Sequence, residues 1–262
     1  MKPGISKTAF GLISLVACLA AASGASADGN GPCASTAKQQ ARLLCPDLRI
    51  AKPSQMYTDR KTKKGRVLLR ATNDIMSRGL GPMELRGRRD RSRSMNVTQA
   101  IARRSGGYAL FPTQARLRFF NVGREYGGAY WKVAHPLHFE LWKVNAKRRK
   151  TRQVREGPKQ FYCFRDLELT KPGRHAPDEA VYPACSQNPK ERQVTLGTSV
   201  GWSDIYPSTY DQQWIDVTGL KGCFAYLLRL DPFDSLIELE KKNNVSQKIV
   251  RLPFRKGRPS RC

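Results

Sequence analysis

The chain has 262 residues, of which 40% are hydrophobic, so it can bury a core and is not an intrinsically disordered chain. Lysine and arginine number 47 against 21 acidic residues, which gives a formal net charge of +26. Such a charge attracts polyanions and acidic partners, more weakly as salt rises, but it does not determine the fold.

The first 27 residues have the pattern of a secretory signal peptide. Two lysines precede an apolar run over residues 9–22, and an A-x-A cleavage site ends at Ala27. This run is too short for a membrane-spanning helix, and no later segment is apolar enough to span a bilayer. We therefore expect residues 1–27 to be cleaved and the chain to be secreted or periplasmic. The sequence "LVAC" leaves lipoprotein anchoring at Cys18 as an alternative.

Six cysteines remain after the signal peptide, and an even number in an exported chain predicts disulfides. None forms a C-x-x-C pair, which argues against a zinc site. Sequence does not choose among the 15 possible connectivities. Pairing of each cysteine with the next one along the chain is our working hypothesis. The six are Cys33, Cys45, Cys163, Cys185, Cys223 and Cys262.

Short β-like runs separated by glycine and proline follow one another along the rest of the chain. Only two short helices are expected, over residues 35–44 and 97–104. No βαβ alternation and no internal repeat is present. We therefore expect residues 28–262 to form a single all-β domain, a β-sandwich with basic loops. The expected strands lie within residues 48–50, 65–79, 81–87, 138–144, 214–217, 223–230 and 247–252.

Basic residues concentrate in four segments, which are residues 60–66, 86–93, 147–155 and 255–262. One interpretation is a set of solvated loops. The functional alternative is a surface that binds anionic polymers or acidic proteins outside the cytoplasm. Nucleic acid is attracted by the same charge, but the predicted export makes it a poor candidate partner.

The segment "GTSVG" at residues 197–201 fits the G-x-S-x-G pattern of a serine hydrolase. That pattern needs a strand, a sharp turn and then a helix, with the catalytic histidine later in the chain. The following "WSDIYPSTY" does not predict a helix, and all three histidines precede Ser199. We therefore reject the hydrolase interpretation.

Several segments resemble the catalytic domain of the lysyl oxidase family. The most specific is "SVGWSDIYPSTYDQQWIDVTGLKGCFAYLLRLDP", which begins at Ser199 and is followed by "IELEKKNNVSQKIVRL". The segments "KQFYCFRD" (159–166) and "HFELWKV" (138–144) are similar to two further parts of that domain, and weaker similarity begins near Cys45. The resemblance covers roughly residues 45 to 252.

This resemblance implies a β-sandwich of lysyl oxidase type, export, disulfides, a copper ion and a self-made lysine tyrosylquinone. The quinone oxidises primary amines to aldehydes and releases ammonia and hydrogen peroxide. It requires a tyrosine ring that is oxidised and a lysine amine that adds to the ring. By resemblance the lysine falls on Lys159 and the tyrosine falls on Tyr206.

The copper motif of the family is H-x-H-W-H in bacterial members, and it falls without gaps on residues 128–132. Trp131 is kept, but Gly128, Tyr130 and Lys132 replace the three histidines. Imidazole is a ligand that Cu(II) favours, whereas a lysine amine must first lose its proton, at a cost near neutral pH. The copper motif is therefore degenerate in this chain.

His135 and His138 lie just after this motif and are the remaining metal candidates. A spacing of three places side chains on opposite faces of a strand, so both can bind one ion only if the chain bends at Pro136. We hypothesise an exported, lysyl-oxidase-like binding protein without amine oxidase activity. The alternative is a copper-dependent amine oxidase that uses Lys159 and Tyr206, with ligands rebuilt around the two histidines.

Overall fold

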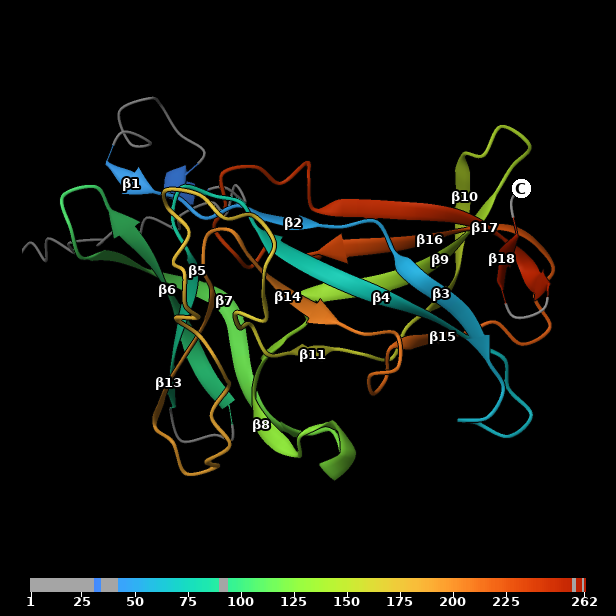
Figure 1. Ribbon diagram of the computed structural model, residues 1–262, viewed down its shortest axis with the longest axis horizontal. Coiled ribbons are helices and arrows are strands. Elements are labelled where there is room, and N and C mark those ends of the chain that lie inside the picture. Colours follow the sequence, from blue (N-terminus) through green and yellow to red (C-terminus); the bar gives the residue numbers. More distant parts are fainter. Residues whose placement is uncertain (1–30, 34–41, 90–93, 256–257, 261) are drawn as a thin grey trace, which may run out of the picture.

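A computed structural model shows an almost entirely β protein (Figure 1). The predicted signal peptide, Cys18 and most of the helix expected over residues 35–44 lie outside the described part of the chain. No helix within that part is long and apolar enough to cross a membrane. The structure describes residues 31–33, 42–89, 94–255, 258–260 and 262.

Three antiparallel sheets hold the strands, and two short 3-10 helices, η1 (Gly31–Cys33) and η2 (Arg124–Tyr126), accompany them. The seven-stranded sheet has the order β11 (Phe161–Tyr162), β8 (Ala129–Ala134), β7 (Tyr108–Asn121), β6 (Ser94–Arg103), β5 (Met83–Arg89) and β13 (Gln193–Thr198), with β1 (Leu43–Leu44) beside β6. The five-stranded sheet has the order β10 (Lys150–Glu156), β9 (Leu137–Val144), β16 (Gly222–Leu230), β17 (Val245–Arg255) and β18 (Arg258–Ser260). In the third sheet β4 (Leu68–Ser77) pairs with β2 (Leu48–Ile50), β3 (Ser54–Asp59), β14 (Trp202–Tyr206) and β15 (Trp214–Asp216), and β14 also pairs with β12 (Glu168–Leu169).

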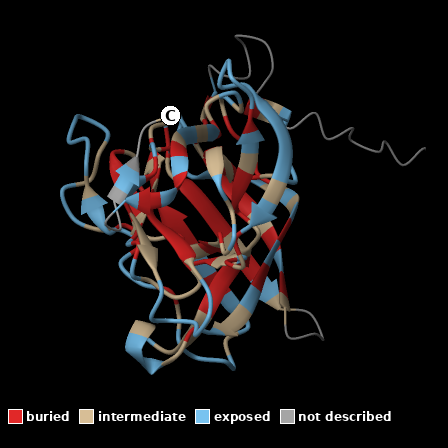
Figure 2. Cartoon of the chain, turned by 90° about the vertical axis from the view of Figure 1, so that its right-hand side faces the viewer, coloured by how far each residue is buried: buried red, intermediate tan, exposed pale blue. Residues whose placement is uncertain are grey.

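The five-stranded sheet packs against the sheet built on β4, and this contact confirms the predicted sandwich. Strand β2 lies against β16 and β17, and β15 lies against β9. Figure 2 shows buried residues on the strands of the interior and exposed residues mainly in the loops. The fully buried Ile75, Phe139 and Leu228 join one core from the two sheets. Each such side chain stabilises the fold by about 1.5–3 kcal/mol.

The helix expected over residues 97–104 is wrong, because residues 97–103 belong to β6 and Arg104 begins the following turn. Strands β5 and β7 pair with β6 on its two edges, and Val97 and Ile101 are buried. Sheet pairing on both edges therefore outweighs the helix propensity of this alanine-containing segment. The expected strands correspond to β2, β4, β5, β9, β15, β16 and β17.

Three disulfides join the six cysteines that the structure describes in consecutive pairs, which confirms the sequential pairing. The first connects η1 to the residues before β2, and the third connects β16 to the C-terminal residue. The second lies beside β11 and closes the segment that follows it. The pairs are Cys33–Cys45, Cys163–Cys185 and Cys223–Cys262.

Gly157 follows β10 in close contact with the ring of Phe139, and its backbone N–H donates a 2.8 Å hydrogen bond to the Phe139 carbonyl oxygen. A Cβ atom at residue 157 would lie 1.7 Å from a ring carbon of Phe139. We expect Gly157→Ala to lower the free energy of unfolding by about 1–3 kcal/mol through overpacking. Gly173 provides the control, because nothing lies within 4 Å of a Cβ atom built there. Gly173→Ala should therefore change the free energy of unfolding by less than about 0.5 kcal/mol. Chemical denaturation of both variants tests this, and equal stabilities would contradict it.

Candidate functional site

Lys159 and Tyr206 are far apart in the sequence but meet in the interior. Lys159 lies just before β11, which pairs with β8, and Tyr206 ends β14, where it pairs with Asn73 of β4. The Lys159 Nζ atom is 5.0 Å from the centroid of the Tyr206 ring. The two residues are 2% and 6% exposed. The structure therefore brings together the two residues that the resemblance assigns to the quinone.

Tyrosine rings surround the Lys159 amine. Its Nζ atom lies 4.9 Å from the ring centroid of Tyr162 and 4.5 Å from that of Tyr210, within the range of cation–π attraction. The Tyr162 and Tyr206 rings meet edge to face at 4.8 Å. The Tyr206 hydroxyl donates a 2.7 Å hydrogen bond to the carbonyl oxygen of Cys163. These contacts hold the Tyr206 ring in one orientation against the amine.

A second buried lysine, Lys132 of β8, lies next to this group. It is 1% exposed, and its Nζ atom is 4.3 Å from the ring centroid of Tyr130 and 5.2 Å from that of Phe120. The amine makes no hydrogen bond to any residue that the structure describes. The hydroxyl groups of Tyr130 and Tyr210 are hydrogen-bonded to each other. This contact joins the rings around Lys132 to those around Lys159.

Burial dominates the electrostatics of the site. Burial, together with the charge of Lys159, lowers the pKa of Lys132 to about 7, although Asp211 and Asp204 act in the opposite direction. It also lowers the pKa of Lys159 to about 8, while Asp211 and Asp204 act in the opposite direction. The same desolvation raises the pKa of Asp204 and that of Tyr206 well above their ordinary values. Near neutral pH the site therefore carries less charge than its residue types suggest.

The side chains at residues 128, 130 and 132 do not fit a copper ion. Gly128 has no side-chain donor, the Tyr130 hydroxyl is bonded to another tyrosine, and Lys132 is an amine. Burial raises the pKa of Tyr130, so its phenol stays protonated at neutral pH. A protonated Lys132 would repel a cation at short range. Among the residues described, no group of three or more His, Cys, Asp or Glu side chains could hold a metal ion.

His135 and His138 lie away from the two lysines. The chain bends between β8 and β9 as it passes from the seven-stranded to the five-stranded sheet, and the two imidazole rings come within 5.6 Å of each other. His135 contacts the ring of Phe161, which stacks on Phe120, and Phe120 in turn faces Lys132. The bend that a histidine pair requires is therefore present, but two aromatic rings connect the pair to the lysine site.

Sequence reasoning did not identify the residues that surround the two amines. Tyr162 lies within the "KQFYC" segment, and Tyr210 follows Tyr206 by four residues, so both stood in the segments that resemble the family. The separation of only four residues between Tyr206 and Tyr210 was a signal that Tyr210 lies near the site. No local signal indicated that Lys132 would be buried, because that depends on packing between strands.

The rejected hydrolase motif has a structural role. The Ser199 hydroxyl donates a 2.7 Å hydrogen bond to Asp166, and strand β14, rather than a helix, begins three residues later. His175 lies on an exposed loop. The serine therefore has no arrangement suited to nucleophilic catalysis.

The site thus combines an antiparallel β-sandwich with a lysine amine buried against a tyrosine ring. The family model described as Lysyl oxidase matches residues 126–258. The chain therefore belongs to the lysyl oxidase family, whose active members use copper and lysine tyrosylquinone. The matched segment contains both lysines, the tyrosine and the histidine pair. A search of curated proteins gives no match to the chain.

Replacement of Lys132 by methionine tests the cost of burying its amine. The folded-state pKa of about 7 lies below the ordinary 10.5, so the unfolded state binds more protons between these values. The destabilisation is complete below about pH 7 and disappears as pH rises through 10.5. We expect Lys132→Met to be more stable than the wild type by on the order of a few kcal/mol near pH 6, with the difference narrowing toward pH 10.

Chemical denaturation at a series of pH values measures this difference. Lys190 is exposed, so Lys190→Met is a matched control and should change the free energy of unfolding by less than about 0.5 kcal/mol at each pH. A Lys132→Met variant less stable than the wild type near pH 6 would contradict the expectation.

Proposed function

We propose that this chain is an exported, non-catalytic member of the lysyl oxidase family that binds an anionic polymer. The observation that carries the proposal is the buried amine of Lys132, at a position where the family's copper motif has a histidine. The predicted signal peptide and the three disulfides support export of residues 28–262 as one domain. The basic loops support the choice of an anionic partner.

The loss of oxidation follows from the ligand set. In this family quinone formation depends on copper, and Gly128, Tyr130 and Lys132 offer no imidazole. Retention of Lys159 and Tyr206 does not compensate, because neither residue supplies the oxidising metal centre. In this proposal the two residues keep a packing role, with the amine held among the tyrosine rings.

The close approach of Lys159 to Tyr206 favours a second candidate function. At 5.0 Å from amine to ring centroid, the pair is close enough that local movement could bring the amine to the ring. A copper-dependent amine oxidase with ligands around His135 and His138 would make use of it. The two functions differ in a product that can be measured directly, hydrogen peroxide.

Purified mature protein, incubated with copper and then with a primary amine, is expected to show no quinone absorbance and no hydrogen peroxide above background. Lys159→Met and Tyr206→Phe are the matched controls and should give the same background. Peroxide release by the wild type that both variants abolish would establish the oxidase and overturn the non-catalytic proposal. Copper binding without quinone absorbance would agree with the non-catalytic proposal, because a bound ion without the quinone does not oxidise amines.

The proposed anionic surface lies at one end of the molecule and is called the basic end here. It consists of loop 60–66 between β3 and β4 and of residues 143–155 of the β9–β10 hairpin. The Lys63 Nζ atom lies 4.3 Å from the ring centroid of Trp214 on β15, and β15 packs against β10. Figure 1 shows β10 and β15 at the same end of the molecule. The exposed basic residues are Arg60, Lys61, Lys63, Lys64, Arg66, Lys143, Lys147, Arg148, Arg149, Lys150, Arg152 and Arg155.

The composition of the basic end favours a polymer over a folded acidic protein. Protein interfaces depend on a few apolar or aromatic anchor residues. The exposed large hydrophobic residues that the structure describes all lie outside the two segments of the basic end. Asp216, an acidic residue beside it, is paired with Arg66 at 3.2 Å. Exposed positive charge without apolar anchors suits a flexible chain of negative charges.

A variant with Lys147→Gln, Arg149→Gln and Arg152→Gln tests this surface. We expect it to bind a sulfated polysaccharide such as heparin about tenfold more weakly than the wild type at low salt, with a shallower salt dependence. The matched control removes three exposed charges elsewhere, through Lys171→Gln, Arg174→Gln and Lys190→Gln. Equal losses in the two triple variants would show that net charge, and not the basic end, determines binding. Salt-independent binding to an acidic protein would favour the other partner class.

A further inference from the structure

His135 and His138 face each other through one nitrogen of each ring. The Nδ1 atom of His135 is 3.4 Å from the Nε2 atom of His138. Hydrogen bonds donated by N–H groups usually span about 2.7–3.2 Å, so this separation is long for a direct bond. Two imidazole nitrogens that each lie about 2.0–2.1 Å from one tetrahedral ion are about 3.3–3.4 Å apart. The observed separation therefore matches a shared metal ion better than a hydrogen bond.

Glu156 at the end of β10 holds the second histidine. Its Oε1 atom is 3.1 Å from Nδ1 of His138, the ring nitrogen that faces away from His135. Histidines that bind metals commonly donate this other N–H to a carboxylate, which fixes the tautomer and leaves the first nitrogen free to bind. The Glu156 contact thus prepares Nε2 of His138 as a ligand atom.

His135 is held in an uncommon backbone conformation. Its φ of 56° lies in the left-handed region, which non-glycine residues rarely adopt, and its N–H donates a hydrogen bond to the Gln160 carbonyl oxygen. The conformation directs the ring toward His138 instead of to the opposite face of a strand. Residues in such conformations are enriched at functional sites.

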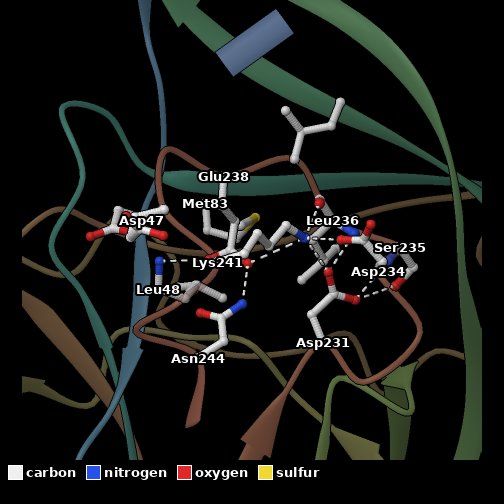
Figure 3. Close-up of polar contacts among 12 residues, drawn as sticks. Asp47, Leu48, Met83, Asp231, Asp234, Ser235, Leu236, Glu238, Lys241 and Asn244 are labelled. Carbon is white, nitrogen blue, oxygen red and sulfur yellow. Dashed lines mark hydrogen bonds and ion pairs between the residues drawn. The ribbon is translucent and has the colours of Figure 1, made fainter. Parts of the chain in front are cut away.

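A rigid loop covers one side of the pair. Phe233 meets both imidazole rings edge to face, with centroid distances of 5.6 and 5.4 Å. The Asp231 N–H donates to the Pro136 carbonyl oxygen at 2.8 Å. The Lys241 amine is 2.6 Å from Asp231 and 2.8 Å from Asp234, the residues on each side of the turn (Figure 3). The loop that carries Phe233 is therefore fixed against the bend.

A cavity of about 190 Å³ adjoins His135 beside the Phe233 loop and is lined by Gln114, Ala115, Arg116, Ala134, Phe233 and Ser235. It leaves room for water molecules to complete the coordination of an ion. Burial lowers the pKa of His135, and the neighbouring His138 and Arg118 lower it further, while Glu156 opposes them. His135 is therefore a neutral imidazole at physiological pH, although the positive charge of Arg118 weakens the binding of cations.

We propose that His135 and His138 bind one divalent ion of the imidazole-preferring class, Zn²⁺ or Cu²⁺, with Glu156 as a positioning residue and water as the remaining ligands. The rings of Phe161 and Phe120 connect the histidine pair to the Lys132 amine, and the proposed ion needs neither Lys159 nor Tyr206 as a ligand. The proposal therefore stands whether or not the chain oxidises amines.

Isothermal titration of the purified chain with ZnCl₂ or CuSO₄ alone is expected to show one ion per chain. His135→Gln and His138→Gln should each weaken binding by at least about tenfold, and Glu156→Gln by about tenfold. His175→Gln removes the third, exposed histidine and should bind like the wild type. Equal affinity in the three histidine variants would overturn the proposal.

A spectroscopic count of ligands provides a second readout that does not depend on stability. Electron paramagnetic resonance of the Cu²⁺-loaded wild type should show hyperfine coupling to two imidazole nitrogens, and His135→Gln should show one. Circular dichroism confirms that each variant is folded. If His138→Gln does not fold, the Glu156→Gln titration and the wild-type spectrum decide the question. A wild-type spectrum without imidazole coupling would overturn the site.

Discussion

The burial of the Lys159 amine against the Tyr206 ring is the constraint on which the centre of this molecule depends. An amine loses favourable hydration when it is buried, and here three tyrosine rings replace part of that hydration. The arrangement requires β11 to pair with β8 while β14 pairs with β4. Two strand pairings between distant parts of the chain therefore have to form together.

Lys132 changes the electrostatics around Lys159 and Tyr206. Burial lowers the pKa of both amines toward neutrality, and the charge of Lys159 adds to the lowering at Lys132. A copper ion in the same place would add more positive charge without gaining an imidazole ligand. The surrounding electrostatics thus oppose a metal next to Lys159 and Tyr206, the two residues that the resemblance assigns to the quinone.

The remaining distinctive features lie outside this centre. The bend at Pro136 joins two sheets and turns His135 toward His138, at the open end of the hairpin, where β9 begins and β10 ends. The same hairpin carries much of the exposed positive charge, and Glu156 at its end contacts His138. The proposed metal site and the basic end therefore share the β9–β10 hairpin of the five-stranded sheet, which does not contain the buried lysines.

The sequence by itself determined the β class, the family, the disulfide cysteines and the absence of histidine from residues 128–132, and it singled out Lys159 and Tyr206 by resemblance. Each of these depends on residue identity or short-range pattern, which can be read locally. Only the tertiary structure decided that residues 97–103 form a strand, that Lys132 is buried beside a second amine, and that two histidines three residues apart face each other. These outcomes depend on pairing and packing between distant segments, and local periodicity carries no record of such contacts.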